Sequence, residues 1–201
     1  MKTIRETTGR FREAFGQKPF TEDEFLFNLS RTTTDVYGEL YGDQDREAKR
    51  ILYEYINEHR EKRIVPMRGA NEILAFLHGQ GIVLGVVSNM NPRLLRDQIE
   101  SLGWTQYFRA IVGAGEATEP KPSAAPLILA AERAGVEFDP QKIWMVGDTE
   151  TDIGCVRAAK CVAVLLKSRR DWQNIVRNIP PDLAIDTLLE IRDFISIQSF
   201  V

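Results

Sequence analysis

Short apolar strands alternate with amphipathic helices from about residue 64 onward, and this alternation constrains the fold more than any other feature of the chain. The strand pattern is clearest in the β-branched run from Ile82 to Val87. The next helix is expected to begin at Asn91-Pro92 and to end at Gly103, because asparagine caps helices, proline suits their first turn and glycine closes them. Such alternation predicts a parallel sheet wrapped by helices.

The same reading places the remaining elements of this part. Further strands are expected at 110–112, 143–146 and 162–166, with a short edge strand at 183–185, and further helices at 122–134, 151–159 and 188–195.

The N-terminal third contains helical patterns only. From Ile4 onward, apolar residues recur three and four positions apart, which is the spacing of an amphipathic helix face. Thr21 and Asp43 follow breaks in the pattern and are expected to cap two of the helices. The chain is therefore expected to divide into a small helical unit, residues 1–63, and an α/β unit, residues 64–201.

Composition and charge are those of an ordinary globular protein. The chain is 43% apolar and 27% charged with a net charge of −3, so it lacks the basic field that nucleic-acid binding requires. Its apolar runs fall short of the roughly 18 residues that span a bilayer, and residues 1–20 do not resemble a secretory signal. We therefore expect a cytoplasmic protein with no membrane or nucleic-acid partner. Cys155 and Cys161 lack zinc-site spacing and are expected to be buried, reduced thiols.

The strongest functional signal is a pair of acids after the third expected strand. The strand stops at Gly147, and Asp148 and Asp152 follow four positions apart. Carboxylates are hard oxygen ligands that suit Mg²⁺, and ligands of open parallel sheets bind beyond the carboxyl ends of the strands. The alternative is that Asp148 or Thr149 simply caps the next helix.

Two other loops carry polar groups of the kind that binds phosphate. Ser88 and Asn89 follow the first strand and precede a helix N-terminus, where backbone N–H groups favour an anion, although such residues also commonly satisfy turns. Lys121 precedes Pro122 at an expected helix start, an unfavourable place for a cation. A carboxylate cluster or a bound phosphate would explain it, and so would a solvated surface lysine paired with Glu119.

Taken in their order along the chain, the three loops resemble the motifs of the haloacid dehalogenase-like (HAD) hydrolase superfamily, specifically its phosphoglycolate-phosphatase-like branch. Val86-Val87-Ser88-Asn89 matches the second motif, Lys121-Pro122 the third and Gly147–Asp152 the fourth. The resemblance implies a Rossmann-like, doubly wound parallel sheet, in an α/β core, with residues 1–63 as a helical cap. It also implies a Mg²⁺-dependent phosphatase of a small phosphorylated metabolite that works through an aspartyl phosphate.

The resemblance also implies a role for each matched residue. Ser88 and Asn89 would bind the transferring phosphoryl group, and Lys121 would neutralise the nucleophile and the phosphate. Asp148 would bind Mg²⁺, and Asp152 would bind the ion or orient its water. The paired acids favour the Mg²⁺-dependent phosphatases over the metal-free dehalogenases of the superfamily.

The first motif of the family, an Asp-x-Asp nucleophile loop on the central strand, has no counterpart here. Asp43-Gln44-Asp45 matches the Asp-x-Asp pattern, but no expected strand precedes it, so we reject it as the first motif. A sheet without that strand is expected to pair its two neighbours directly or to leave backbone groups unsatisfied, and to be poorly stable. We expect the native product to extend upstream by about 20 residues, the length of one strand and its loop.

Two other functions were weighed against the phosphatase. A phosphate-binding pseudoenzyme of the same fold would keep the Mg²⁺ and phosphate sites without turnover, and it stays open. A signalling receiver domain also combines acids, a hydroxyl and a lysine, but there the paired acids come first, whereas here they follow Lys121. We therefore set the receiver domain aside.

Overall fold

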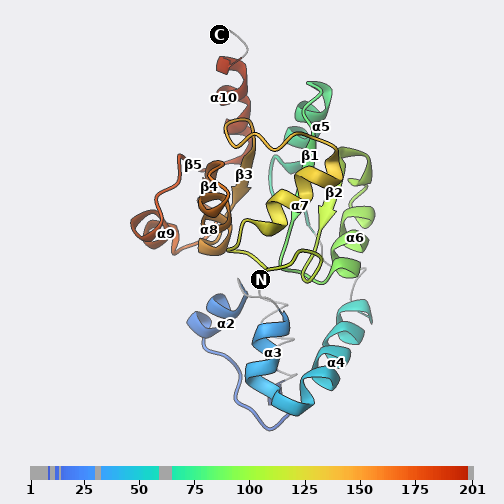
Figure 1. Cartoon of the computed structure of the whole chain (residues 1–201). Helices are drawn as coiled ribbons and strands as arrows, with labels where there is room; N and C mark the ends of the chain where they lie inside the picture. The colour runs from blue at the N-terminus through green and yellow to red at the C-terminus, as the bar shows by residue number, and fades with distance from the viewer. Residues whose placement is uncertain (1–8, 10–11, 14, 30–32, 59–64, 199–201) are drawn as a thin grey trace. The chain divides into compact units, whose positions relative to one another are not determined.

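The computed structural model describes residues 9, 12–13, 15–29, 33–58 and 65–198. Contacts between Cα atoms divide the chain into two compact units, Met1–Ile64 and Val65–Val201, which are described separately (Figure 1). The helix expected from Ile4 and the boundary at residue 63 lie outside the described residues. Among the described residues, none of the helices combines the length and the hydrophobicity that a membrane-spanning segment needs.

The first unit is helical, as the periodicity indicates. It contains α2 (Glu22–Leu29), α3 (Thr33–Tyr41), a 3₁₀ turn (Gly42–Gln44) and α4 (Asp45–Glu58). Its buried cluster includes Tyr41, whose ring lies 5.0 Å from Tyr37 and 5.2 Å from Phe15, measured between ring centroids.

Only one of the two caps expected in this unit forms. Thr21 Oγ1 accepts a hydrogen bond from the Glu24 amide, and the Glu24 carboxylate accepts one from the Thr21 amide. This reciprocal pair confirms Thr21 as a cap. Asp43 is wrong as a cap, because it lies inside the 3₁₀ turn and α4 begins only at Asp45.

The second unit alternates strands and helices. Its strands are β1 (Leu84–Val87), β2 (Phe108–Val112), β3 (Trp144–Gly147), β4 (Val162–Leu166) and β5 (Leu183–Ile185). Its helices are α5 (Ala70–Gly79), α6 (Pro92–Ser101), α7 (Ala125–Ala134), α8 (Glu150–Ala158), α9 (Trp172–Asn178) and α10 (Ile191–Gln198). All the strand pairs are parallel, and the expected α/β class is confirmed.

Helices cover both faces of the strands, which is the doubly wound arrangement. Along β4, Ala163 and Leu165 belong to a buried cluster that takes residues from α7, α8 and α9, whereas Val164 and Leu166 belong to one that takes residues from α5 and α10. Because successive side chains of a strand point to opposite faces, a strand that is buried on both sides reads as the continuous apolar run seen here.

The strands form two sheets within this unit. One has the order β1-β2 and the other β3-β4-β5, so 183–185 is an edge strand as expected. In the described part of the chain, β1 and β3 make no ladder with each other, so the direct pairing considered from the sequence does not occur. The two sheets share a core, because Leu84 of β1 and Trp144 of β3 both pack against the cluster from α5 and α10.

Some elements differ from their expected positions. The expected helix start at Pro122 is wrong, because α7 begins at Ala125. A turn closed by the Ser123 amide and the Pro120 carbonyl occupies the position of the first helical turn, and Ser123 Oγ accepts from the Ala125 amide. Helices α5 and α9 were not predicted. Strands β4 and β5 have the expected bounds, and the other boundaries differ by at most three residues, which is common at element ends.

Candidate functional site

The capping geometry at the start of α6 shapes the first of the three loops. Asn91 Oδ1 accepts hydrogen bonds from the amides of Arg93 and Leu94, and Pro92 occupies the first turn, as predicted. The helix therefore begins at Pro92, four residues after Ser88. The Ser88 amide donates to the Val112 carbonyl of β2, and Ser88 Oγ accepts from the Met90 amide.

The loop after β3 is held by a reciprocal cap at the start of α8. Thr149 is the N-cap, and its Oγ1 accepts from the Asp152 amide at 3.2 Å. Asp152 Oδ2 in turn accepts from the amides of Asp148 (3.2 Å) and Thr149 (3.1 Å) and from the Thr149 hydroxyl (2.6 Å). The capping alternative weighed from the sequence is thus correct for Thr149, and Asp152 completes the cap.

Lys121 and Asp152 form a buried ion pair. Lys121 Nζ lies 2.6 Å from Asp152 Oδ1, and only 8% and 10% of the two side chains are exposed. The ammonium also donates to the carbonyl of Val87, the last residue of β1, at 3.2 Å. The alternative of a solvated lysine paired with Glu119 is wrong, because the partner of Lys121 is a buried acid 31 residues away.

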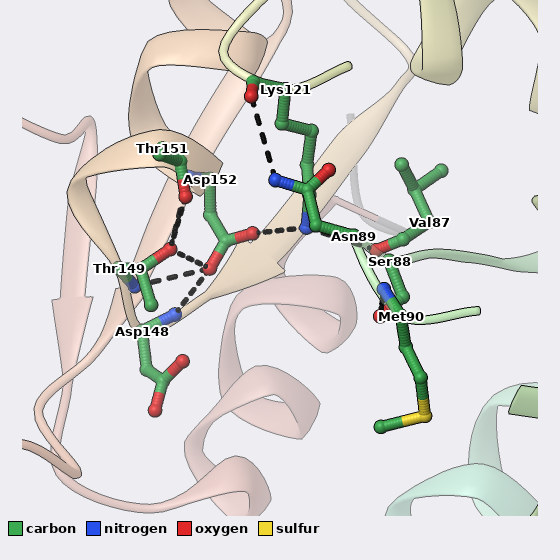
Figure 2. Close-up of polar contacts among 9 residues, drawn as sticks. All are labelled: Val87, Ser88, Asn89, Met90, Lys121, Asp148, Thr149, Thr151 and Asp152. Atoms are coloured by element: carbon green, nitrogen blue, oxygen red, sulfur yellow. Dashed lines mark hydrogen bonds and ion pairs between the residues drawn. The ribbon is translucent and has the colours of Figure 1, made fainter. Parts of the chain in front are cut away.

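The environment of Asp152 keeps it ionised. Burial alone would raise its pKa, but the Lys121 charge and the hydrogen bonds from Lys121 and Thr149 outweigh burial, and the pKa is lowered. With 7% of its surface exposed, Asp152 is also the one polar or charged residue that is buried as a whole among the described positions. A buried carboxylate with this many donors holds the loops after β1 and β3 and Lys121 in one arrangement (Figure 2).

Asn89 and Asp148 lie at the margins of this pair. The Asn89 amide nitrogen makes a long contact of 3.5 Å to the Lys121 carbonyl. The Asp148 carboxylate points away from the Lys121 ammonium (Figure 2), and its Oδ2 accepts from Ser168 Oγ at 2.7 Å. The two acids of the motif therefore do not converge on one point. In the described residues, no group of three or more His, Cys, Asp or Glu side chains is placed to hold a metal ion.

The sequence reasoning missed Ser168. It follows β4 by two residues and reaches Asp148 because β3 and β4 are parallel neighbours whose carboxyl ends meet at one edge. The sequence did contain a signal for Ser168, since a hydroxyl that follows a predicted parallel strand lies at the carboxyl edge of the sheet. Four of the five expected residues lie on loops, and Asp152 lies in the first turn of α8. The structure connects Lys121 with Asp152 most closely.

A family model described as "Haloacid dehalogenase-like hydrolase" matches residues 1–166. The chain belongs to this family. The match covers both the helical unit and the three loops, so the resemblance inferred from the motifs is confirmed.

Curated relatives that the chain resembles are named phosphoglycolate phosphatases. The protein of Nitrosococcus oceani is 32% identical over 169 residues, which cover 84% of this chain and 74% of that protein. The protein of Salmonella typhimurium is 27% identical over 187 residues, which cover 93% of this chain and 68% of that protein. The protein of Neisseria meningitidis is 36% identical, over 64% of this chain and 57% of that protein.

Solved structures confirm the HAD fold. A haloacid dehalogenase-like hydrolase from Bacteroides fragilis matches with a TM-score of 0.82 at 20% identity, over 94% of this chain and 91% of that one. A phosphoglycolate phosphatase described from Haemophilus somnus matches with a TM-score of 0.81 at 20% identity, over 95% and 89% of the two chains.

Proposed function

We propose that this chain carries the phosphate-binding and Mg²⁺-binding half of a phosphatase that acts on a small phosphorylated metabolite through an aspartyl phosphate. The observation that carries this proposal is the buried pair of Lys121 and Asp152 at the carboxyl ends of β1 and β3. Its support is twofold, because the chain is a member of the HAD family and its curated relatives are named phosphoglycolate phosphatases.

The roles proposed for the side chains follow their positions. Lys121 supplies a fixed positive charge that neutralises a phosphoryl group, and Asp152 positions that charge. Ser88 and Asn89 bind phosphoryl oxygens at the end of β1, where the N-terminus of α6 also favours an anion. Residues 1–63 are assigned to a cap that selects the substrate, and residues 64–201 to the core. The cytoplasm is the compartment we propose.

Asp148 is the better candidate for a Mg²⁺ ligand. Both oxygens of Asp152 already accept hydrogen bonds, whereas Asp148 Oδ1 accepts none from the described residues. Mg²⁺ is commonly bound by one or two carboxylates and otherwise keeps water, so a single protein carboxylate with phosphate oxygens fits its chemistry. When bound, the ion would offset the negative charge of the phosphate. Asp152, as a positioning acid, would hold the ammonium of Lys121 toward the same phosphate.

We propose that residues 1–201 lack the attacking carboxylate and therefore do not turn over by themselves. The gap between the sheets supports this proposal, because in the described part β1 is paired only with β2 and β3 only with β4. One further parallel strand between β1 and β3 would complete the ladder and end beside Lys121. In place of a backbone ladder between β1 and β3, a side chain connects their ends, because Lys121 donates to both the Val87 carbonyl and Asp152.

Hydrolysis of p-nitrophenyl phosphate tests the proposal. The rate is measured for the 201-residue chain and for a form extended with its native upstream codons, each with and without Mg²⁺. We expect Mg²⁺-dependent turnover in the extended form only, and loss of Mg²⁺ dependence in its Asp148→Asn variant. An in-frame stop codon upstream, with no Asp-x-Asp segment, would defeat the proposal of a missing nucleophile.

The pseudoenzyme stays a candidate because every proposed phosphate-binding side chain is present without the nucleophile. Binding of inorganic phosphate, measured by calorimetry, separates the cases. Phosphate binding without turnover in both forms favours the pseudoenzyme. Absence of phosphate binding in both forms would contradict both functions.

A further inference from the structure

Glu116 lies in the loop that follows β2, at the centre of an ion-pair network. Its Oε1 lies 2.7 Å from an Arg96 guanidinium nitrogen and 3.0 Å from one of Arg133, while Oε2 accepts from the Gly113 amide at 2.7 Å. Arg96 belongs to α6 and Arg133 to α7. One carboxylate thus connects two helices to the loop between them.

The two arginines do more than neutralise the acid. Each also donates to the carbonyl of Ile111 in β2, at 3.4 Å from Arg96 and 3.1 Å from Arg133. The side chain of Glu116 is only 18% exposed. Burial raises its pKa, but the Gly113 amide and both arginines outweigh burial, and the net effect is a lowered pKa. The carboxylate is therefore charged at neutral pH, when it can accept from all three donors.

The loop that Glu116 holds is packed against the loop that carries Ser88 and Asn89. The Ala114 amide donates to the Met90 carbonyl at 2.8 Å. A Cβ atom at Gly113 would lie 2.7 Å from Pro92 Cα and 3.0 Å from the Met90 carbonyl oxygen, so the two backbones are in close contact. A shift of residues 113–116 would therefore move the 88–92 backbone.

We propose that Glu116 is a positioning residue that sets the geometry of the phosphate-binding loop at Ser88 and Asn89. It acts through Gly113 and Ala114, which support Met90 from the side of β2, and it does not touch the phosphate. The inference rests on the proposed function only for the identity of the ligand, because the contacts between the two loops are independent of what binds there.

Asp182 provides a matched control within the same unit. It too accepts a backbone hydrogen bond, from Ala163 at 2.7 Å, and it pairs with an arginine, Arg157, at 3.0 Å. Its pKa is also lowered, against the effect of burial, by the Ala163 amide and by Arg157. It joins the start of β5 to β4 and α8, and among the described residues its hydrogen bonds go to Ala163 and Arg157, not to the 88–92 loop. Glu116→Gln and Asp182→Asn therefore each remove a charged acceptor of one backbone amide and of arginine, at different places in the unit.

The experiment measures the dissociation constant of inorganic phosphate by calorimetry for the 201-residue chain and for both variants, under conditions where each is folded. Both variants lose a charged acceptor, and we expect both to melt at a lower temperature. We expect Glu116→Gln to weaken phosphate binding about tenfold or more, because displacement of binding groups by a fraction of an ångström is costly. Asp182→Asn is expected to leave the constant unchanged within about twofold.

Hydrogen exchange of the Ala114 and Met90 amides gives a second readout that needs no ligand. Faster exchange at both amides in Glu116→Gln, but not in Asp182→Asn, is the expected result. If the parent chain binds phosphate and Glu116→Gln has the same dissociation constant, the inference is overturned. Unchanged exchange rates at the Ala114 and Met90 amides would overturn it as well. If the parent chain binds no phosphate, the proposed function fails, and the exchange rates still decide whether Glu116 positions the loop.

Discussion

Gly147 leaves no room for a side chain because Asp152 crosses directly over it. A Cβ atom at position 147 would overlap the Asp152 Cβ and lie 2.6 Å from its Cγ. The glycine of the motif is thus required by the close approach of the acid that pairs with Lys121. The contact explains why a strand that delivers these acids ends in Gly-Asp.

Gly147→Ala should therefore destabilise the fold. We expect a decrease in the free energy of unfolding of about 1–3 kcal/mol, the usual cost of overpacking, measured by urea denaturation. Gly79→Ala is the control, because an added Cβ there meets nothing within 4 Å and Gly79 ends helix α5. The control should change stability by no more than about 1 kcal/mol and in the stabilising direction. Equal effects at both positions would contradict the steric argument.

Lys121→Met leaves the Asp152 carboxylate buried without its cation. We expect a loss of about 3–5 kcal/mol in the free energy of unfolding, the usual cost of breaking a buried ion pair by removing one partner. The exposed pair of Lys142 and Asp139, at 3.2 Å, serves as the comparison. Lys142→Met should cost no more than about 1 kcal/mol, because water already solvates both charges. A small loss in Lys121→Met would show that the buried pair contributes little.

The lowered pKa of Asp152 predicts a loss of stability in acid. A carboxylate whose pKa is lowered on folding stabilises the protein at pH values above the pKa it has in the unfolded chain, near 3.8. This contribution is lost as the pH falls toward the pKa it has in the folded protein. Urea denaturation at several pH values between 7 and 3 should show the free energy of unfolding falling most steeply below about pH 4. The Asp152→Asn variant should be less stable at pH 7 but show a shallower decrease in acid, and an equal slope would argue against the assignment.

Ser168→Ala removes the hydrogen bond that orients Asp148. If Asp148 binds Mg²⁺, loss of the hydroxyl that orients this ligand is expected to lower the affinity for Mg²⁺ about tenfold, within the range seen for such groups. Titration of Mg²⁺ by calorimetry measures the change. Ser101→Ala is the control, since that hydroxyl donates to the Gln98 carbonyl at the end of α6. Equal Mg²⁺ affinity in the parent chain and in Ser168→Ala would exclude an orienting role.

Both cysteines should resist thiol reagents in the folded protein. Burial raises the pKa of Cys155 to about 11, and burial followed by the nearby Asp139 raises that of Cys161. Since the thiolate is the reactive form, we expect negligible reaction with Ellman's reagent at pH 7.5 and two equivalents after denaturation in urea, from the two cysteines of the chain. Rapid reaction without denaturant would show that the core around Cys155 opens readily.

Local signals predicted the elements whose ends are determined by neighbouring residues. The cap at Asn91-Pro92 depends on contacts within a few positions, and it is confirmed by the hydrogen bonds that Asn91 Oδ1 accepts from the Arg93 and Leu94 amides. Strand β4 was predicted without error because it is buried on both faces and reads as one apolar run. Helix α7 was predicted to start too early, because the turn at 120–123 depends on how that loop packs.

What the sequence alone determined about this protein is the order of the five strands and of helices α6, α7, α8 and α10, with the chemical groups at their ends, because these follow from hydrophobic periodicity and local backbone preferences. Only the tertiary structure decided the partners of those groups. Lys121 pairs with Asp152 and not with Glu119, and Asp148 with Ser168, because parallel strands bring their carboxyl ends to one edge regardless of separation in the chain. Packing also decided that β1 and β3 stand in separate sheets that share a core.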